Sequence, residues 1–182
     1  MKKVVTSTVL LIITCLTLVA QNYISKDKII DGVRTIEAHP SVFEHQTEQY
    51  VLSWNYTKSD SRGIEGYYLA ILANDQVAPW NITAGDKLQL GLIQQNEYIE
   101  LVALMDASPE AYETPNGTKY RTMAYYIVPS SEYSKLFKGF DRFKIDVKVR
   151  NIAPVTLAVK LPFSAIEHML MSYLDIMIVT GR

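Results

Sequence analysis

Residues 143–149 read Phe-Lys-Ile-Asp-Val-Lys-Val, a strict alternation of apolar and charged side chains. Because successive side chains of a β-strand point to opposite faces of a sheet, this spacing predicts a strand with one face on a core and the other in water. Residues 155–161 (Val-Thr-Leu-Ala-Val-Lys-Leu) repeat the pattern after a short link at 151–154. The two stretches therefore predict an antiparallel hairpin.

The same period of two continues toward the N-terminus. Leu88, Leu90 and Leu92 alternate with other residues, and a second alternating stretch from Ile99 to Met105 follows, which predicts another hairpin. Stretches rich in Tyr, Val, Ile and Leu predict further strands at residues 33–38, 48–55, 67–73 and 120–128. Short strands without long helices between them favour an antiparallel sandwich or a strongly curled sheet.

Two helices are predicted near the C-terminus. A short connector begins at Ser130 or Ser131 and ends before Gly139. A longer helix begins with the capping box Ser164-x-x-Glu167, ends at Gly181 and carries an apolar stripe of Ile166, Met169, Leu170, Tyr173, Leu174 and Met177. We expect this stripe to pack on the sheet as core, and a groove for a lipid or a partner helix is the alternative. The fold class is therefore α+β, predominantly antiparallel β, with a C-terminal amphipathic helix on the sheet.

The N-terminus has the features of a signal peptide. Lys2 and Lys3 precede an uncharged, largely apolar run from Val4 to Ala20, which is slightly short for a membrane span. We therefore predict a signal peptide at residues 1–20 and a single mainly-β domain at 21–182, exported to the periplasm, the cell surface or the medium. The alternative is an uncleaved anchor at residues 4–20 that tethers the domain to the membrane.

Cysteine usage supports export through a bacterial envelope. Cys15 is the single cysteine and lies inside the predicted signal peptide, with larger residues before it than a lipid-modified cysteine would require. A mature chain without cysteine excludes disulfides, thiolate metal sites and a cysteine nucleophile. Three N-x-S/T sequons, which begin at Asn55, Asn81 and Asn116, are given little weight because such triplets also arise by chance.

Charge argues against a nucleic-acid partner. Without Lys2 and Lys3, 16 basic residues stand against 19 acidic ones, and no basic stretch is longer than two residues. Such a chain lacks the positive surface that binds phosphate backbones.

No motif for catalysis, cofactor binding or metal binding is found. The chain has no G-x-S-x-G elbow and no glycine-rich phosphate loop, so we predict no cofactor and no catalytic residue. His39 and His45 lie near acidic residues, but their spacing matches no metal motif and we interpret this segment as solvated. Five acidic residues between positions 97 and 113 leave open a small hydrolase that acts on glycans, with Glu97, Glu100, Asp106, Glu110 and Glu113 as candidates.

Aromatic residues near turns are the feature that points to recognition. Trp80, Tyr98 and Tyr112 are expected in or beside loops, where amphipathic rings can stack on sugars or anchor protein contacts. Residues 106–119 form the longest irregular stretch expected between strands. The sequence therefore predicts a non-enzymatic binding or structural interaction module with a protein or glycan partner. The alternatives are the glycan hydrolase and a carrier of an apolar ligand between the C-terminal helix and the sheet.

Overall fold

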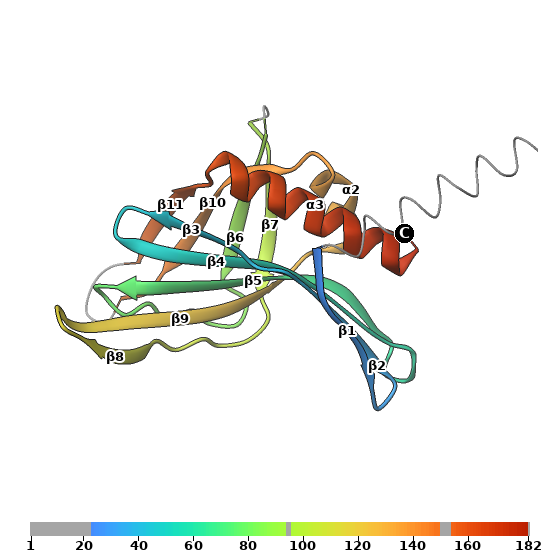
Figure 1. The fold of residues 1–182 in the computed structure, drawn as a ribbon, viewed down its shortest axis with the longest axis horizontal. Helices are drawn as coiled ribbons and strands as arrows, with labels where there is room; N and C mark the ends of the chain where they lie inside the picture. Colours follow the sequence, from blue (N-terminus) through green and yellow to red (C-terminus); the bar gives the residue numbers. More distant parts are fainter. Residues whose placement is uncertain (1–22, 94–95, 150–153, 182) are drawn as a thin grey trace, which may run out of the picture.

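Residues 23–93, 96–149 and 154–181 are described by a computed structural model, shown in Figure 1. Eleven strands of this part of the chain join in one antiparallel sheet. The strands are β1 (Ile24–Ile30), β2 (Val33–Ala38), β3 (Ser41–His45), β4 (Glu48–Ser59), β5 (Ile64–Gln76), β6 (Lys87–Leu92), β7 (Tyr98–Ala103), β8 (Glu110–Thr114), β9 (Gly117–Ile127), β10 (Phe140–Val147) and β11 (Val155–Lys160). The predicted signal peptide lies outside the described residues.

The sheet is strongly curled and does not close into a barrel. Its strand order is β1-β2-β4-β5-β9-β7-β6-β10-β11, with β3 paired to β4 and β8 paired to β9. In Figure 1 the strands β6 and β7 stand steeply across β4, β5 and β9, and the β1–β2 hairpin projects away from the helical side. This geometry confirms the predicted antiparallel α+β fold class.

The core lies on the inner face of the curl, and β4 shows how the sequence places it there. Tyr50, Leu52, Trp54 and Tyr56 of this strand are each at most 2 % exposed, whereas the residues between them are half-buried on the opposite face. The alternation in β10 works in the same way, because Phe143, Ile145 and Val147 are buried. Both strands thus have the two-faced pattern that the sequence predicts.

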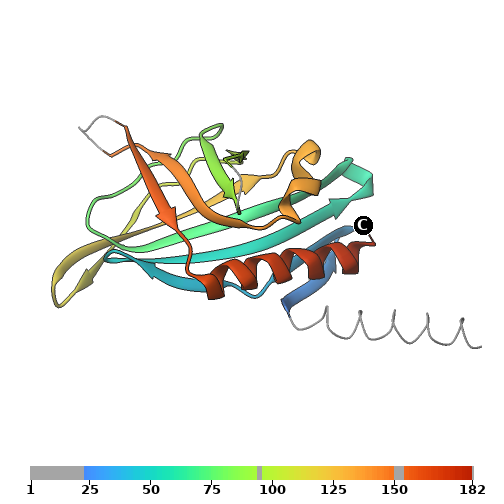
Figure 2. The ribbon, with the colours of Figure 1, turned by 90° about the horizontal axis from the view of Figure 1, so that it is seen from above.

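The C-terminal helix α3 (Phe163–Thr180) lies across the inner side of β3, β4 and β10, as Figures 1 and 2 show. By length and composition α3 could cross a membrane, but seven of its 18 residues are buried, including Met169 and Tyr173. This is the arrangement of a core helix. The helix ends as predicted at Gly181, whose φ of 75° is left-handed.

Two details of the helices differ from the prediction. The helix α3 begins two residues earlier than an N-cap at Ser164 would place it, with Pro162 at the N-cap position and no side-chain capping bond, so the predicted capping box at Ser164 is wrong. Because Ser164 lies inside the first turn, it cannot serve as the N-cap. The connector η3 (Ser130–Glu132) and α2 (Tyr133–Leu136) match the predicted short helix, but Pro129 is the N-cap in place of Ser130 or Ser131, and no side chain forms a capping bond.

Three strands are absent from the sequence prediction. The strand β1 is largely polar, and β3 is too short for its alternation to stand out. The interpretation of residues 106–119 as a long irregular stretch is wrong, because Glu110–Thr114 form β8 and pair with β9. Each of these strands depends on the neighbour that supplies its hydrogen bonds, and this dependence is not visible in a local pattern.

Candidate functional site

An open groove of about 1020 Å³ lies on the outer face of the sheet, opposite α3. Its floor consists of outward-facing residues of β2, β4, β5 and β9, and its walls are formed by the start of β1 and by Leu104 and Met105 after β7. The volume is at the upper end of the range of ligand sites in proteins. This groove is the largest hollow that we identify in the described part of the chain.

Strand pairing arranges the floor in rows, because directly paired residues in antiparallel strands present their side chains on the same face. The first row is apolar: Val51, Leu72 and Met123 line the groove, and Val42 of β3 continues the row on the same face beyond the lining residues. The second row is small at its centre and consists of Ser53, Ala70 and Tyr125. The third row is polar and consists of Lys26, Glu37, Asn55 and Tyr68.

The apolar end of the groove is open to solvent. Met123 is 46 % exposed, and Leu104 and Met105 beside it are 47 % and 52 % exposed. A hydrogen bond of 2.8 Å from the Leu104 N–H to the Tyr125 carbonyl oxygen fixes this wall against β9. The solvated face of an antiparallel sheet is ordinarily polar, so an apolar row here requires an explanation other than the core.

The polar end carries the charged groups. Lys26 Nζ lies 2.8 Å from Glu37 Oε2, and both side chains line the groove. Burial raises the pKa of Tyr68, and the nearby Tyr133 adds to the shift, so the Tyr68 hydroxyl keeps its proton at neutral pH. A second hollow of about 320 Å³ adjoins this end through Thr35 and is lined by Lys28, Ile30, Asp31, Val33, Thr35 and Arg62.

The structure places the three predicted aromatic residues on different elements, and none of their described contacts joins them. Trp80 is 4 % exposed and packs near Tyr50, with a ring distance of 6.2 Å. Trp80 does lie in the loop between β5 and β6, as the sequence predicts, but its ring is buried in the core and is therefore not presented to a ligand. Tyr98 is the first residue of β7, where Lys144 Nζ lies 4.8 Å from its ring centre and Arg142 lies over the same ring.

Tyr112 has a structural role at a bulge of β5. Its hydroxyl donates a hydrogen bond of 2.8 Å to Asp75 Oδ1 and accepts one of 3.0 Å from the Asp75 N–H. Asp75 has a φ of 59°, a left-handed conformation that non-glycine residues seldom adopt. Its carboxylate raises the pKa of Tyr112, which keeps the hydroxyl protonated. The two hydrogen bonds between Tyr112 and Asp75 thus hold a strained position where the pairing of β5 and β9 shifts register.

The acidic residues proposed for hydrolysis do not converge. Most of them contact a different neighbour: Glu100 pairs with Lys87 at 2.8 Å, Glu110 pairs with Arg121 at 2.9 Å, and Glu113 accepts a bond of 2.9 Å from Thr118. Glu97 lies 4.0 Å from Lys138. Such pairs of exposed side chains stabilise strands and turns, and they do not form the facing carboxylates that glycoside hydrolysis needs.

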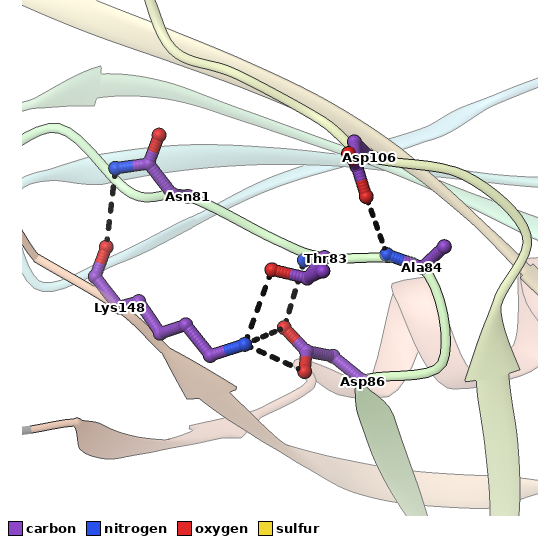
Figure 3. A network of polar contacts seen from close by, with 6 residues as sticks. All are labelled: Asn81, Thr83, Ala84, Asp86, Asp106 and Lys148. Carbon is purple, nitrogen blue, oxygen red and sulfur yellow. Dashed lines mark hydrogen bonds and ion pairs between the residues drawn. The ribbon is translucent and has the colours of Figure 1, made fainter.

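Asp106, the fifth acidic candidate, belongs to a network that fastens the loop between β5 and β6. Its Oδ1 accepts a bond of 2.8 Å from the Ala84 N–H (Figure 3). Close by, Lys148 Nζ lies 2.9 Å from each carboxylate oxygen of Asp86 and 3.1 Å from Thr83 Oγ1. Burial works against the charge of Asp86, but the bonds from Lys148 and the Thr83 N–H lower its pKa on balance. The network is structural.

The histidine segment is solvated only in part, because His39 and Glu44 are exposed whereas other residues of the segment belong to a strand. Residues 41–45 form β3 with Ser41 and Phe43 buried, and His45 has its ring edge toward Tyr50. The backbone oxygen of His39 lies 2.8 Å from His168 Nε2. Among the described residues, no group of three or more His, Cys, Asp or Glu side chains is placed to hold a metal ion.

The region between α3 and the sheet, the predicted location for an apolar ligand, is filled by aromatic side chains. The ring centre of Tyr173 lies 5.4 Å from that of Trp54 and 5.5 Å from that of Tyr67. The groove on the opposite face was missed because its residues come from separate strands. One signal was available: Tyr67–Ala73 is an unbroken apolar run, which indicates apolar side chains on both faces of β5.

Comparison of the chain with protein-family models, with curated proteins and with solved structures finds no match.

Proposed function

We propose that this chain is an exported, non-enzymatic binding module and that the outer-face groove is its binding surface. The observation that carries the proposal is the apolar row of Val42, Val51, Leu72 and Met123 on a face that the fold leaves open. Because water-facing apolar surface of this extent is costly, a face of this kind is typical of an interaction site. The signal-peptide pattern of residues 1–20 supports export.

The groove supports binding in preference to catalysis. Its floor combines apolar side chains with a few polar groups, which is the composition of ligand sites that fix orientation without chemistry. Its charged side chains, Lys26 and Glu37, neutralise each other at 2.8 Å. The acidic candidates for hydrolysis contact other neighbours, so the hydrolase alternative receives no support from their arrangement.

The first test uses an apolar fluorescent probe, 1-anilinonaphthalene-8-sulfonate. The full chain is expressed with its own N-terminus in a bacterial host, and the fractionated protein is purified and titrated with the probe. Met105→Glu and Met123→Glu place a charge on two half-exposed groove positions without opening a core cavity. Val77→Glu is the matched control, because Val77 is 70 % exposed and does not line the groove.

We expect a fluorescence gain with the wild-type protein and the Val77→Glu variant, and a marked loss of this gain in both groove variants. Equal fluorescence in all four proteins would contradict the proposed binding surface. Intact mass and cell fractionation test export separately. A mature chain that begins near Gln21 outside the cytoplasm is expected, and a full-length chain in the cytoplasm would contradict export.

A further inference from the structure

We infer that the groove accepts a single-chain amphiphile with an anionic head group, whose alkyl chain lies on the apolar row and whose head lies at Lys28 and Arg62. This inference rests on the proposed function and names the ligand class for the same surface.

The chemical character of the floor changes in one direction along β4. The outward residues of β4 are, in order, Val51, Ser53, Asn55 and Thr57, so the strand runs from the apolar row to the polar end. At a rise of about 3.3 Å per residue, these positions span roughly 20 Å. A ligand that matches this floor is elongated, with an apolar part and a polar part at opposite ends.

The middle of the groove is shaped for a slender chain. Ser53 and Ala70 are paired across β4 and β5 and are small, whereas Tyr125 continues the row on β9 and Tyr68 follows in the next row. The Tyr68 hydroxyl lies over Gly66, where an added Cβ would be 3.4 Å from it. The Tyr68 ring therefore lies along β5 toward Gly66 and does not cover Ser53 and Ala70 at the centre of the floor.

The charge at the polar end indicates the sign of the head group. The cations around this hairpin are mostly neutralised: Lys26 pairs with Glu37, Arg34 with Asp27 and Lys58 with Asp60. In contrast, Lys28 and Arg62, which line the adjoining hollow, form no ion pair with any residue that the structure describes. Asp31 is the acidic residue of that hollow, so the two cations exceed the negative charge there. An anionic head complements this end of the groove.

Strand pairing also places Lys28 in line with the groove. Lys28 pairs with Thr35, and Thr35 pairs with Thr57, so the three side chains form the row that follows the polar row. Thr35 lines both hollows. The alkyl chain and the head group can therefore lie along one continuous path on the same face of the sheet.

The test compares laurate with dodecyltrimethylammonium, two amphiphiles that share a twelve-carbon chain and differ in head-group charge. Binding to the purified full chain is measured by isothermal titration calorimetry at low salt, below the concentration at which either amphiphile forms micelles. Two variants are compared with the wild-type protein. The first combines Lys28→Glu with Arg62→Glu, and the second carries Met105→Glu alone. Lys160→Glu is the control for a charge reversal away from the groove, because Lys160 is exposed on β11 at the opposite end of the strand order. Thermal melts verify that every variant is folded.

We expect the wild-type protein to bind laurate about tenfold more tightly than the cation, and the double charge reversal to abolish or invert this preference. Added salt should weaken laurate binding, because exposed ion pairs are screened. Equal affinities for both amphiphiles, or laurate binding that the double reversal leaves unchanged, would overturn the inference.

The outcomes separate the ligand class from the binding surface. If both amphiphiles bind with equal affinity and Met105→Glu abolishes their binding, the groove remains the binding surface. The inferred preference for an anionic head group is then wrong. If neither amphiphile binds, and the gain in probe fluorescence is the same for the groove variants as for the wild-type protein, both proposals fail. If Met105→Glu instead converts a dimer to a monomer in sedimentation, the groove is an interface between copies and the inference is overturned.

Discussion

Trp54 on β4 donates a hydrogen bond of 2.9 Å from its indole Nε1 to the backbone oxygen of Met169 on α3, across 115 residues of sequence. The donor is buried at 1 % exposure, and its ring packs against Tyr173 of the same helix. One side chain therefore ties the C-terminal helix to the central strands through both a polar and an apolar contact.

The Trp54→Phe variant should lower the free energy of unfolding by about 1–3 kcal/mol, because a buried backbone oxygen loses its side-chain donor. Trp80→Phe is the control, because it also replaces a buried indole by a smaller ring, but at a position with no described hydrogen bond to α3. Urea denaturation followed by circular dichroism measures both. An effect of Trp54→Phe no larger than that of Trp80→Phe would contradict the role assigned to this bond.

The raised pKa of Asp175 in α3 leads to a prediction for how the stability of the protein depends on pH. It is 2 % exposed, and burial raises its pKa to about 6 despite a bond of 3.2 Å from the Tyr23 N–H. Because the folded state holds this proton more tightly than the unfolded chain, Asp175 makes stability fall as pH rises from about 4 to about 6.

The Asp175→Asn variant should therefore be more stable than the wild-type protein above about pH 6 and similar to it near about pH 4. The melting temperature of both proteins, measured across this range, tests the sign. Asp60→Asn is the control, because its side chain is 89 % exposed. A wild-type curve that parallels the Asp175→Asn curve would show that Asp175 does not titrate in this range.

Gly139, which lies between the connector helix and β10, should tolerate alanine less well than Gly63 does. Its φ of 69° is left-handed, and an added Cβ would lie 2.9 Å from Ile93 Cδ1. Gly63→Ala is the matched control, because Gly63 has a φ of 61° with no atom within 4 Å of its would-be Cβ. Both variants carry the backbone cost of about 1 kcal/mol, and Gly139→Ala adds a steric cost, so its melting temperature should fall further. Equal decreases in melting temperature would show that the Ile93 side chain moves aside at no measurable cost and would contradict this prediction.

The Lys148→Met variant should loosen the loop between β5 and β6. The side chain of Lys148 joins Asp86 and Thr83 (Figure 3). The bond from Asn81 Nδ2 to the Lys148 backbone oxygen and the bond from the Ala84 N–H to Asp106 do not use that side chain and remain in place. A partly exposed ion pair contributes at most about 1 kcal/mol, so global stability should change little. Hydrogen exchange of the Thr83 amide should become faster, because its acceptor, Asp86, loses its cation. Lys160→Met, as a control, should leave this exchange unchanged.

Much of the fold could be predicted from local pattern. The β10–β11 and β6–β7 hairpins are confirmed because alternation along each strand is a local property that the core enforces. The end of α3 at Gly181 is confirmed for a similar reason, since one left-handed residue suffices to end a helix. The start of α3 was missed, because Pro162 replaces the side-chain cap that Ser164 suggested.

The sequence by itself determined which faces of the strands are apolar, and thereby the fold class and the position of the core. Only the tertiary structure decided which outward residues meet. Val51, Leu72 and Met123 become one row because β4, β5 and β9 pair in a particular register. Trp80 is buried and Tyr112 is fixed on Asp75 for the same kind of reason. The period of a strand is written in adjacent residues, whereas register depends on the packing of segments far apart in the chain.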